Sequence, residues 1–177
     1  MKPLFSSAVY QDGNFIFYFI SHHKSVIHIT ASSAKHERAA AFLSLFVPQA
    51  PHISPAEKSH ACNLISAHIY QPDIPGRHVD FENNFFLRRG TLFQRKIWRL
   101  LLEIGYGETM TYSKLALKAG VPGGARAIGN ACNANPLALI IPCHRVIGVN
   151  NPGGYAGGRE VKLKLLEIEA ERFNCRK

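Results

Sequence analysis

Two runs near the start of the chain are rich in aromatic and β-branched residues. GNFIFYFIS covers residues 13–21 and SVIHITAS covers residues 25–32, with only HHK between them. Runs of this kind, joined by a short polar connection, are typical of adjacent antiparallel strands. The pattern therefore predicts a β-hairpin that belongs to a small sheet.

The rest of the first half predicts two helices and connecting chain. Apolar residues recur at helical spacing in residues 34–46 and again in residues 56–71. Between them, VPQAPHISP at residues 47–55 is rich in helix breakers and predicts a loop. Residues 72–89 are interpreted as connecting chain that contains at most one more strand.

The second half has the spacing of helices. From Thr91, a plausible N-cap, an apolar stripe of Phe93, Ile97, Leu100 and Leu101 predicts a helix that ends at the glycines 105 and 107. Near the C-terminus, REVKLKLLEIEAERF (residues 159–173) predicts an amphipathic helix whose inward side carries Val161, Leu165, Leu166 and Ile168.

Two shorter helices are expected between those two. TYSKLALKAG (residues 111–120) begins at a threonine and ends at a glycine, and VPGGARAIGNACNAN (residues 121–135) follows after a tight turn. The second of these has an unusually thin face of alanine and glycine. A helix, a tight turn and a second helix form the helix-turn-helix pattern, which occurs both in plain packing and in DNA binding.

Charge favours DNA binding over plain packing. The net charge of the 177 residues is +9, and residues 91–177 carry 13 Lys and Arg against 6 Asp and Glu, a net charge of +7. A basic half of this kind is typical of a protein with a polyanionic partner, most often a nucleic acid, and equally of a protein with a merely basic surface. The chain contains neither an apolar run long enough for a membrane span nor a recognisable secretory signal, so we expect an intracellular protein, which would be cytoplasmic and associated with the nucleoid if it is bacterial.

The four cysteines are scattered and form no CxxC pair, so we expect free thiols, no structural zinc and no cofactor. Cys132 and Cys175 are interpreted as core or surface residues. Cys143 differs, because IIPCHRVIG places it between Pro142 and a His–Arg pair. Core filling, a metal ligand, a disulfide and a nucleophile are all possible roles. A neighbouring cation or imidazole lowers a thiol pKa, which favours a nucleophile.

A nucleophile needs a base and a group that orients the base. Glutamates on the last predicted helix are candidates for the orienting group. NPGGYAGG, residues 151–158, allows the close approach of a ligand and offers Tyr155 for stacking on a flat aromatic ring. Taken alone, this loop is more typical of a surface turn.

Together these segments resemble the O6-alkylguanine-DNA alkyltransferase family. The resemblance runs over about residues 90–170, through GTLFQRKIW, IGYGETMTYSKLA, GVPGGARAIGNACNANP, LIIPCHRVIG, GGYAGG and VKLKLLEIE. PCHRV followed by GGYAGG is its most specific combination. The resemblance implies irreversible transfer of an alkyl group from DNA to a cysteine, once per molecule.

Five residues would carry the chemistry, as the resemblance implies. Cys143 would accept the alkyl group, and His144 would take the thiol proton through a water while Glu169 orients it. Tyr112 would donate a proton to the departing guanine. Asn135 would brace the active-site turn against the helix-turn-helix.

The resemblance also implies a DNA interface and a base pocket. Arg126 would fill the gap that a flipped nucleotide leaves, and the thin helix would lie in the minor groove. Tyr155 and the backbone of Val146 and Ala156 would line the guanine pocket, supported by Lys162. The remaining expected DNA contacts are Thr111, Ala125, Ala127, Gly129 and Asn130.

We therefore expect an α+β protein of two small domains. Residues 1–89 would form a sheet-plus-helices domain, and residues 90–177 a mainly helical domain with the helix-turn-helix and the acceptor. The expected partner is double-stranded DNA with O6-alkylguanine, and O4-alkylthymine as a second substrate, bound by a monomer with no membrane. A protein that only binds alkylated bases and recruits other factors is the alternative, and a cysteine hydrolase is a second one.

Overall fold

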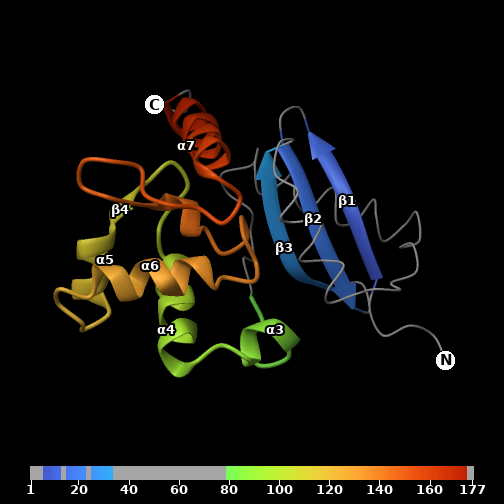
Figure 1. Cartoon of the computed structure of the whole chain (residues 1–177), viewed down its shortest axis with the longest axis horizontal. Coiled ribbons are helices and arrows are strands. Elements are labelled where there is room, and N and C mark those ends of the chain that lie inside the picture. Colours follow the sequence, from blue (N-terminus) through green and yellow to red (C-terminus); the bar gives the residue numbers. More distant parts are fainter. Residues whose placement is uncertain (1–5, 13–14, 23–24, 34–78, 175–177) are drawn as a thin grey trace.

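A three-stranded antiparallel sheet forms one side of the molecule (Figure 1). The computed structural model describes residues 6–12, 15–22, 25–33 and 79–174. β2 (Phe15–His22) pairs with β3 (Ser25–Ser33), which confirms the predicted hairpin. β1 (Ser6–Asp12) adds a strand on the other edge of β2 that the sequence analysis missed. The helices expected at 34–46 and 56–71 and the loop between them lie outside the described residues.

A short helix connects to the helical part of the chain. α3 (Phe85–Arg88) begins after Asn84, whose side-chain oxygen accepts hydrogen bonds from the amides of Phe86 and Leu87. In the described part of residues 72–89, which begins at Val79, this helix stands where we allowed for a strand. The correction has a local cause, because an asparagine N-cap satisfies two amides that a first helical turn leaves free.

α4 (Leu92–Leu101) is capped as the sequence indicates. The Thr91 hydroxyl accepts from the Gln94 amide, and the Gln94 side chain accepts from the Thr91 amide, a reciprocal capping box. The helix ends four residues before Gly105, earlier than expected. A tightened turn follows, in which the amide of Ile104 donates to the carbonyl of Leu101.

The helix-turn-helix pair is present. α5 (Tyr112–Lys118) and α6 (Ala125–Asn133) are joined by a turn in which Gly120 and Gly123 take positive φ angles of 75° and 79°. Immediately before α5, β4 (Met110–Thr111) pairs in parallel with β5 (Val146–Ile147). This pairing, which was not predicted, brings the start of α5 beside the segment that follows Cys143.

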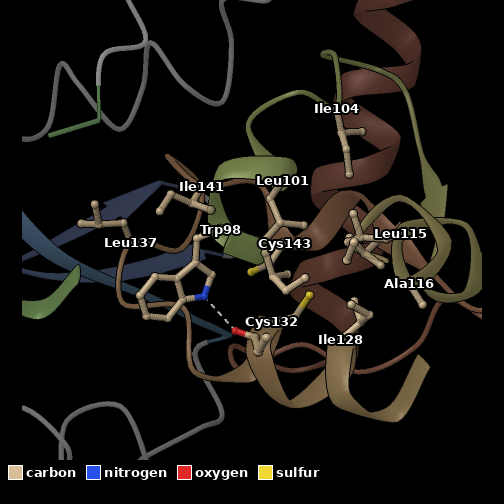
Figure 2. Packing of buried hydrophobic residues seen from close by; sticks show 14 of the residues in the cluster. Trp98, Leu101, Ile104, Leu115, Ala116, Ile128, Cys132, Leu137, Ile141 and Cys143 are labelled. Carbon is tan, nitrogen blue, oxygen red and sulfur yellow. Dashed lines mark hydrogen bonds between the residues drawn. The ribbon is translucent and has the colours of Figure 1, made fainter. Parts of the chain in front are cut away.

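A packed cluster that includes Cys143 joins α4 to α6 (Figure 2). The Trp98 indole is almost fully buried, and its Nε1 donates to the carbonyl of Ala131 over 2.9 Å. The hydrogen bond satisfies the polar atom of a buried ring and fixes the distance between the two helices. The cluster therefore supports the acceptor segment, which we define as Pro142–Arg145.

α7 (Arg159–Asn174) packs between the helical part and β3 (Figure 1). Its buried residues are Val161, Lys162, Leu165 and Glu169, whereas Leu166 and Ile168 are only half-buried. The simple amphipathic stripe was therefore wrong in part, because two charged residues occupy the inward side. The described residues form helices and a small sheet, as the α+β expectation requires. The boundary at residues 89 and 90 stays a prediction.

Candidate active site

The acceptor segment is a tight double turn. Pro142, with φ −81° and ψ 63°, is the centre of an inverse γ-turn in which the Cys143 amide donates to the Ile141 carbonyl over 2.8 Å. A single 3-10 turn, η1 (Cys143–Arg145), follows at once. The fixed φ of proline suits this geometry. The two turns hold the cysteine at a sharp bend instead of in a strand.

Asn135 holds this bend from the end of α6. Its Nδ2 atom donates to the Ile141 carbonyl over 2.8 Å and to the Cys143 sulfur over 3.2 Å. Its Oδ1 atom accepts from the Leu137 amide over 3.0 Å. The side chain is buried, so these bonds are not exchanged with bulk water. One amide group thus connects α6, the turn after it and the acceptor sulfur.

His144 and Glu169 form a buried hydrogen-bonded pair. The His144 Nε2 atom lies 2.8 Å from Glu169 Oε1, and both side chains are almost fully buried. Because a carboxylate only accepts, Nε2 carries the hydrogen and Nδ1 keeps its lone pair. Nδ1 is buried with no partner among the described residues. Burial lowers the pKa of His144 despite the opposing effect of Glu169, so the imidazole is neutral and Nδ1 is free to accept a proton.

Arg145 fixes Glu169 from the other side. Its Nε and Nη2 atoms donate to the two carboxylate oxygens over 2.8 and 2.9 Å, and Nη1 donates to the Ile104 carbonyl over 2.7 Å. The Gly107 amide adds a further bond to Glu169. Burial would raise the pKa of Glu169, but the hydrogen bonds from His144 and Arg145 and the positive charge of Arg145 outweigh it and lower that pKa to about 2. Glu169 is therefore an anion held in a fixed orientation.

The pKa of the Cys143 thiol differs from the expectation. Burial raises the pKa of Cys143, and the Asn135 hydrogen bond and the Lys162 charge offset only part of that effect. We expected the adjacent cation to lower the Cys143 pKa, but the Arg145 guanidinium is bound to Glu169 instead. Adjacency in sequence did not predict side-chain direction. The resting thiol is protonated and needs a base.

Cys143 opens onto a cavity of about 480 Å³. Predicted residues from α5, α6 and the glycine-rich loop meet there: Tyr112, Ala125, Arg126, Gly129, Asn130, Tyr155 and Ala156. The cavity wall also contains Cys132, Asn133 and Gly154, which the sequence analysis did not assign to a site. Cys132 lies one helical turn after Gly129, an expected contact on the same helix, and this spacing could have placed Cys132 at the site.

A buried lysine forms a hydrogen bond to the glycine-rich loop, residues 151–158. Lys162 Nζ donates to the carbonyls of Val146 and Gly154 over 2.5 and 3.1 Å and lies 5.6 Å from the centre of the Tyr112 ring. Burial lowers the Lys162 pKa. Val146 and Lys162 thus lie behind the cavity wall instead of in it. Gly153, at φ 74°, packs so closely on Tyr112 that an added Cβ would lie 2.7 Å from the ring hydroxyl.

Two of the expected DNA contacts are placed away from the cavity. Thr111 caps α5, where its hydroxyl accepts from the Lys114 amide over 3.2 Å, and Ala127 is exposed on α6. Among residues 79–174 and the three strands, no cluster of three or more His, Cys, Asp or Glu side chains has the arrangement of a metal site. In the same residues, every helix is too short or too polar to cross a bilayer.

Known proteins are similar to this chain in sequence. Residues 92–171 match the sequence model of the 6-O-methylguanine DNA methyltransferase DNA-binding domain. A probable methylated-DNA–protein-cysteine methyltransferase of Acanthamoeba polyphaga mimivirus is 50% identical over 103 residues, which cover 54% of this chain and 69% of that protein. The chain belongs to the methylated-DNA–protein-cysteine methyltransferase family.

Solved structures extend the match beyond the aligned half. The Mycobacterium tuberculosis O6-methylguanine methyltransferase is similar over 95% of this chain and 94% of its own, with 30% identity and a TM-score of 0.72. The structure of M. tuberculosis OGT in complex with DNA has a TM-score of 0.69 at the same identity, over 95% of this chain and 93% of that one. The methyltransferase fold thus includes the described sheet as well as the helices.

Proposed function

We propose that this methyltransferase repairs DNA directly, by moving the alkyl group of an O6-alkylguanine onto Cys143. One observation carries the proposal: the Cys143 sulfur faces a cavity, and a neutral histidine fixed by an ionised glutamate lies behind it. Membership in the family supports the reaction, and the DNA complex of the mycobacterial relative supports the partner. O4-alkylthymine is a second substrate of the same chemistry.

The reaction begins with a proton transfer, because the resting thiol is protonated. The unpartnered Nδ1 of His144 accepts the Cys143 proton through a bridging water, and Glu169 stabilises the imidazolium that forms. The thiolate then attacks the alkyl carbon. A sulfur–carbon bond forms as the carbon–O6 bond breaks, and the electron pair leaves with the guanine. The thioether product has no easy leaving group, so each molecule acts once.

Tyr112 is placed to neutralise the departing guanine. Its hydroxyl lies 3.5 Å from the Gly154 carbonyl at the cavity wall. Burial, and then the charges of the two nearby cysteines, raise the pKa of Tyr112 to about 12, so the phenol keeps its proton until a base within the cavity removes it. The guanine anion is such a base. Proton donation at this point makes guanine a better leaving group.

The outer side of α6 suits a DNA groove. Arg126, Ala127 and Asn130 are exposed there, and the small residues Ala125 and Gly129 lie at the cavity mouth. Small side chains permit close approach to the minor groove, roughly 6 Å wide, and Arg126 replaces the stacking of the nucleotide that enters the cavity. A single chain supplies all of these groups, which supports a monomer as the acting unit.

Replacement of Cys143 by serine tests the proposal. The Cys143→Ser variant should bind duplex DNA that contains O6-methylguanine and leave the methyl group in place, because a neutral alcohol is a far weaker nucleophile than a thiolate. Residual alkyl removal at the wild-type rate contradicts the assignment. Wild-type protein that binds the lesion without removing it favours the recruiting protein instead, and product in molar excess over protein favours a hydrolase.

A further inference from the structure

Cys132 and Cys143 face the same cavity. Cys132 lies in the last turn of α6 and Cys143 in the acceptor turn, yet both contribute to the cavity wall. Both are free thiols, 8% and 5% exposed. Figure 2 shows the two sulfur atoms within the packed cluster, in the space between Trp98 and Ile128. The cavity therefore holds a second thiol that the proposed alkyl transfer does not use.

Asn135 fixes the two cysteines relative to each other. Its backbone amide donates to the Cys132 carbonyl over 3.2 Å, and its side chain donates to the Cys143 sulfur over 3.2 Å. The end of α6 and the acceptor turn cannot separate unless one of these bonds breaks. Burial raises the pKa of Cys132, and ionisation of Cys143 raises it further, so the two thiols are electrostatically coupled. Asn135 therefore holds both the end of α6 that carries Cys132 and the turn that carries Cys143.

We propose that Cys132 and Cys143 form a dithiol site for a trivalent arsenical. Thiolates prefer soft, thiophilic centres. Within the described residues no third metal-ligating side chain joins the pair, which disfavours zinc and leaves ligands that need only two sulfurs. An arylarsine oxide meets that requirement. The two S–H bonds and the arsenic–oxygen bonds break, two arsenic–sulfur bonds form, and the oxygen leaves as water with both thiol protons. Arsenic stays trivalent, so no oxidant or reductant is needed.

Binding of an arsenical at this site would block alkyl transfer to Cys143. The sulfur of Cys143 cannot attack an alkyl carbon while it is bonded to arsenic, and the aryl group occupies the cavity. This consequence rests on the proposed function, because it assumes that Cys143 is the alkyl acceptor. The binding itself does not depend on that assumption, since it involves neither DNA nor an alkyl group.

Phenylarsine oxide and the full-length chain test the site without DNA. We expect intact-protein mass spectrometry to show one phenylarsenic group with the loss of two hydrogens, and peptide mapping to place it on Cys132 and Cys143. The adduct should survive excess glutathione and be removed by dithiothreitol, because only a dithiol competes with a two-sulfur chelate. Trp98 is the only tryptophan of the chain and packs in the same cluster, so its fluorescence should fall on binding.

The Cys132→Ser and Cys132→Ala variants should each bind phenylarsine oxide about a hundredfold more weakly, because the second bond no longer forms at high effective concentration. Unliganded Trp98 fluorescence shows whether each variant is folded. Cys62→Ser and Cys175→Ser are the matched controls and should retain the chelate. Undiminished binding by both Cys132 variants, or a chelate mapped to another pair of cysteines, overturns the inference. If Cys143 accepts an alkyl group but no chelate forms, only this inference fails. If the chelate forms without alkyl transfer, only the proposed function fails.

Discussion

The two sides of Cys143 differ in how their polar groups are satisfied. Behind it lies the buried ion cluster, which we define as His144, Arg145 and Glu169, where both carboxylate oxygens and the guanidinium are hydrogen-bonded. In front lies the outer face of α6, defined as Arg126, Ala127 and Asn130, whose side chains are exposed. The first side is suited to fixed proton chemistry, and the second to a large, variable partner. Changes to the two sides should therefore have different signatures.

Glu169→Gln should have the largest effect, because it removes the negative charge that orients His144 and balances the Arg145 guanidinium. We expect alkyl transfer to slow by about 10²- to 10⁴-fold, the usual contribution of a positioned acid or base. The free energy of unfolding should fall by about 3–5 kcal/mol, because a buried guanidinium loses its counter-charge. Single-turnover kinetics and denaturant unfolding measure the two. Glu167→Gln, which removes only the exposed pair with Lys164, is the matched control and should cost at most about 1 kcal/mol.

Acid unfolding gives a second test of the Glu169 charge. The pKa of Glu169 is about 2 in the folded chain and 4.5 as an ordinary carboxyl, so the folded state favours the ionised form. Its contribution to stability is full above about pH 5 and is lost as the pH falls towards 2. Wild-type stability should fall across this window, and the Glu169→Gln variant should show a shallower slope. Equal slopes would mean that Glu169 is not ionised in a charged cluster.

Asn135→Ala should have an intermediate effect, because Asn135 joins α6 to the acceptor turn. The loss of its buried bonds should cost about 1–3 kcal/mol of stability. The hydrogen bond that lowers the Cys143 pKa also disappears, so the rise of the transfer rate with pH should move to higher pH. Rate measurements across pH test this expectation. Asn174→Ala, at the exposed end of α7, should change stability by less than about 0.5 kcal/mol.

Arg126→Ala should have the smallest and most selective effect. Base flipping costs a few kcal/mol, and Arg126 is expected to offset part of that cost only on duplex DNA. Repair of duplex substrate should slow about tenfold, an equivalent of about 1.4 kcal/mol, whereas the reaction with free O6-benzylguanine should keep its rate. Equal losses with both substrates would remove the role in flipping and would blur the contrast between the two sides.

Local signals in the sequence predicted the helices well. Thr91 and Thr111 cap α4 and α5 as expected, and the two runs rich in aromatic and β-branched residues form the β2–β3 hairpin. The two-residue strands β4 and β5 were missed, because so short a pairing leaves no periodic pattern. α3 was missed for a similar reason, since its four residues depend on a single asparagine cap.

The buried charges could not be read from local patterns. Lys162 and Glu169 lie on the inward side of α7, where a hydrophobic stripe was expected, because their partners come from distant segments. Arg145 follows directly after the Cys143–His144 pair, yet its guanidinium points to Glu169 instead of to the thiol. Cys132 was interpreted as core or surface, and it does lie in the core, but its position at the cavity depends on how α6 packs against the acceptor turn. Tertiary contacts decide each of these positions.

Peptide mass spectrometry after a single incubation with DNA that contains O6-methylguanine tests the central claim most directly. The account predicts that the peptide with Cys143 gains the mass of one methylene, in an amount equal to the guanine restored in the DNA. A Cys143 peptide that keeps its mass while every lesion is bound, or a methyl group found on another residue, would contradict it.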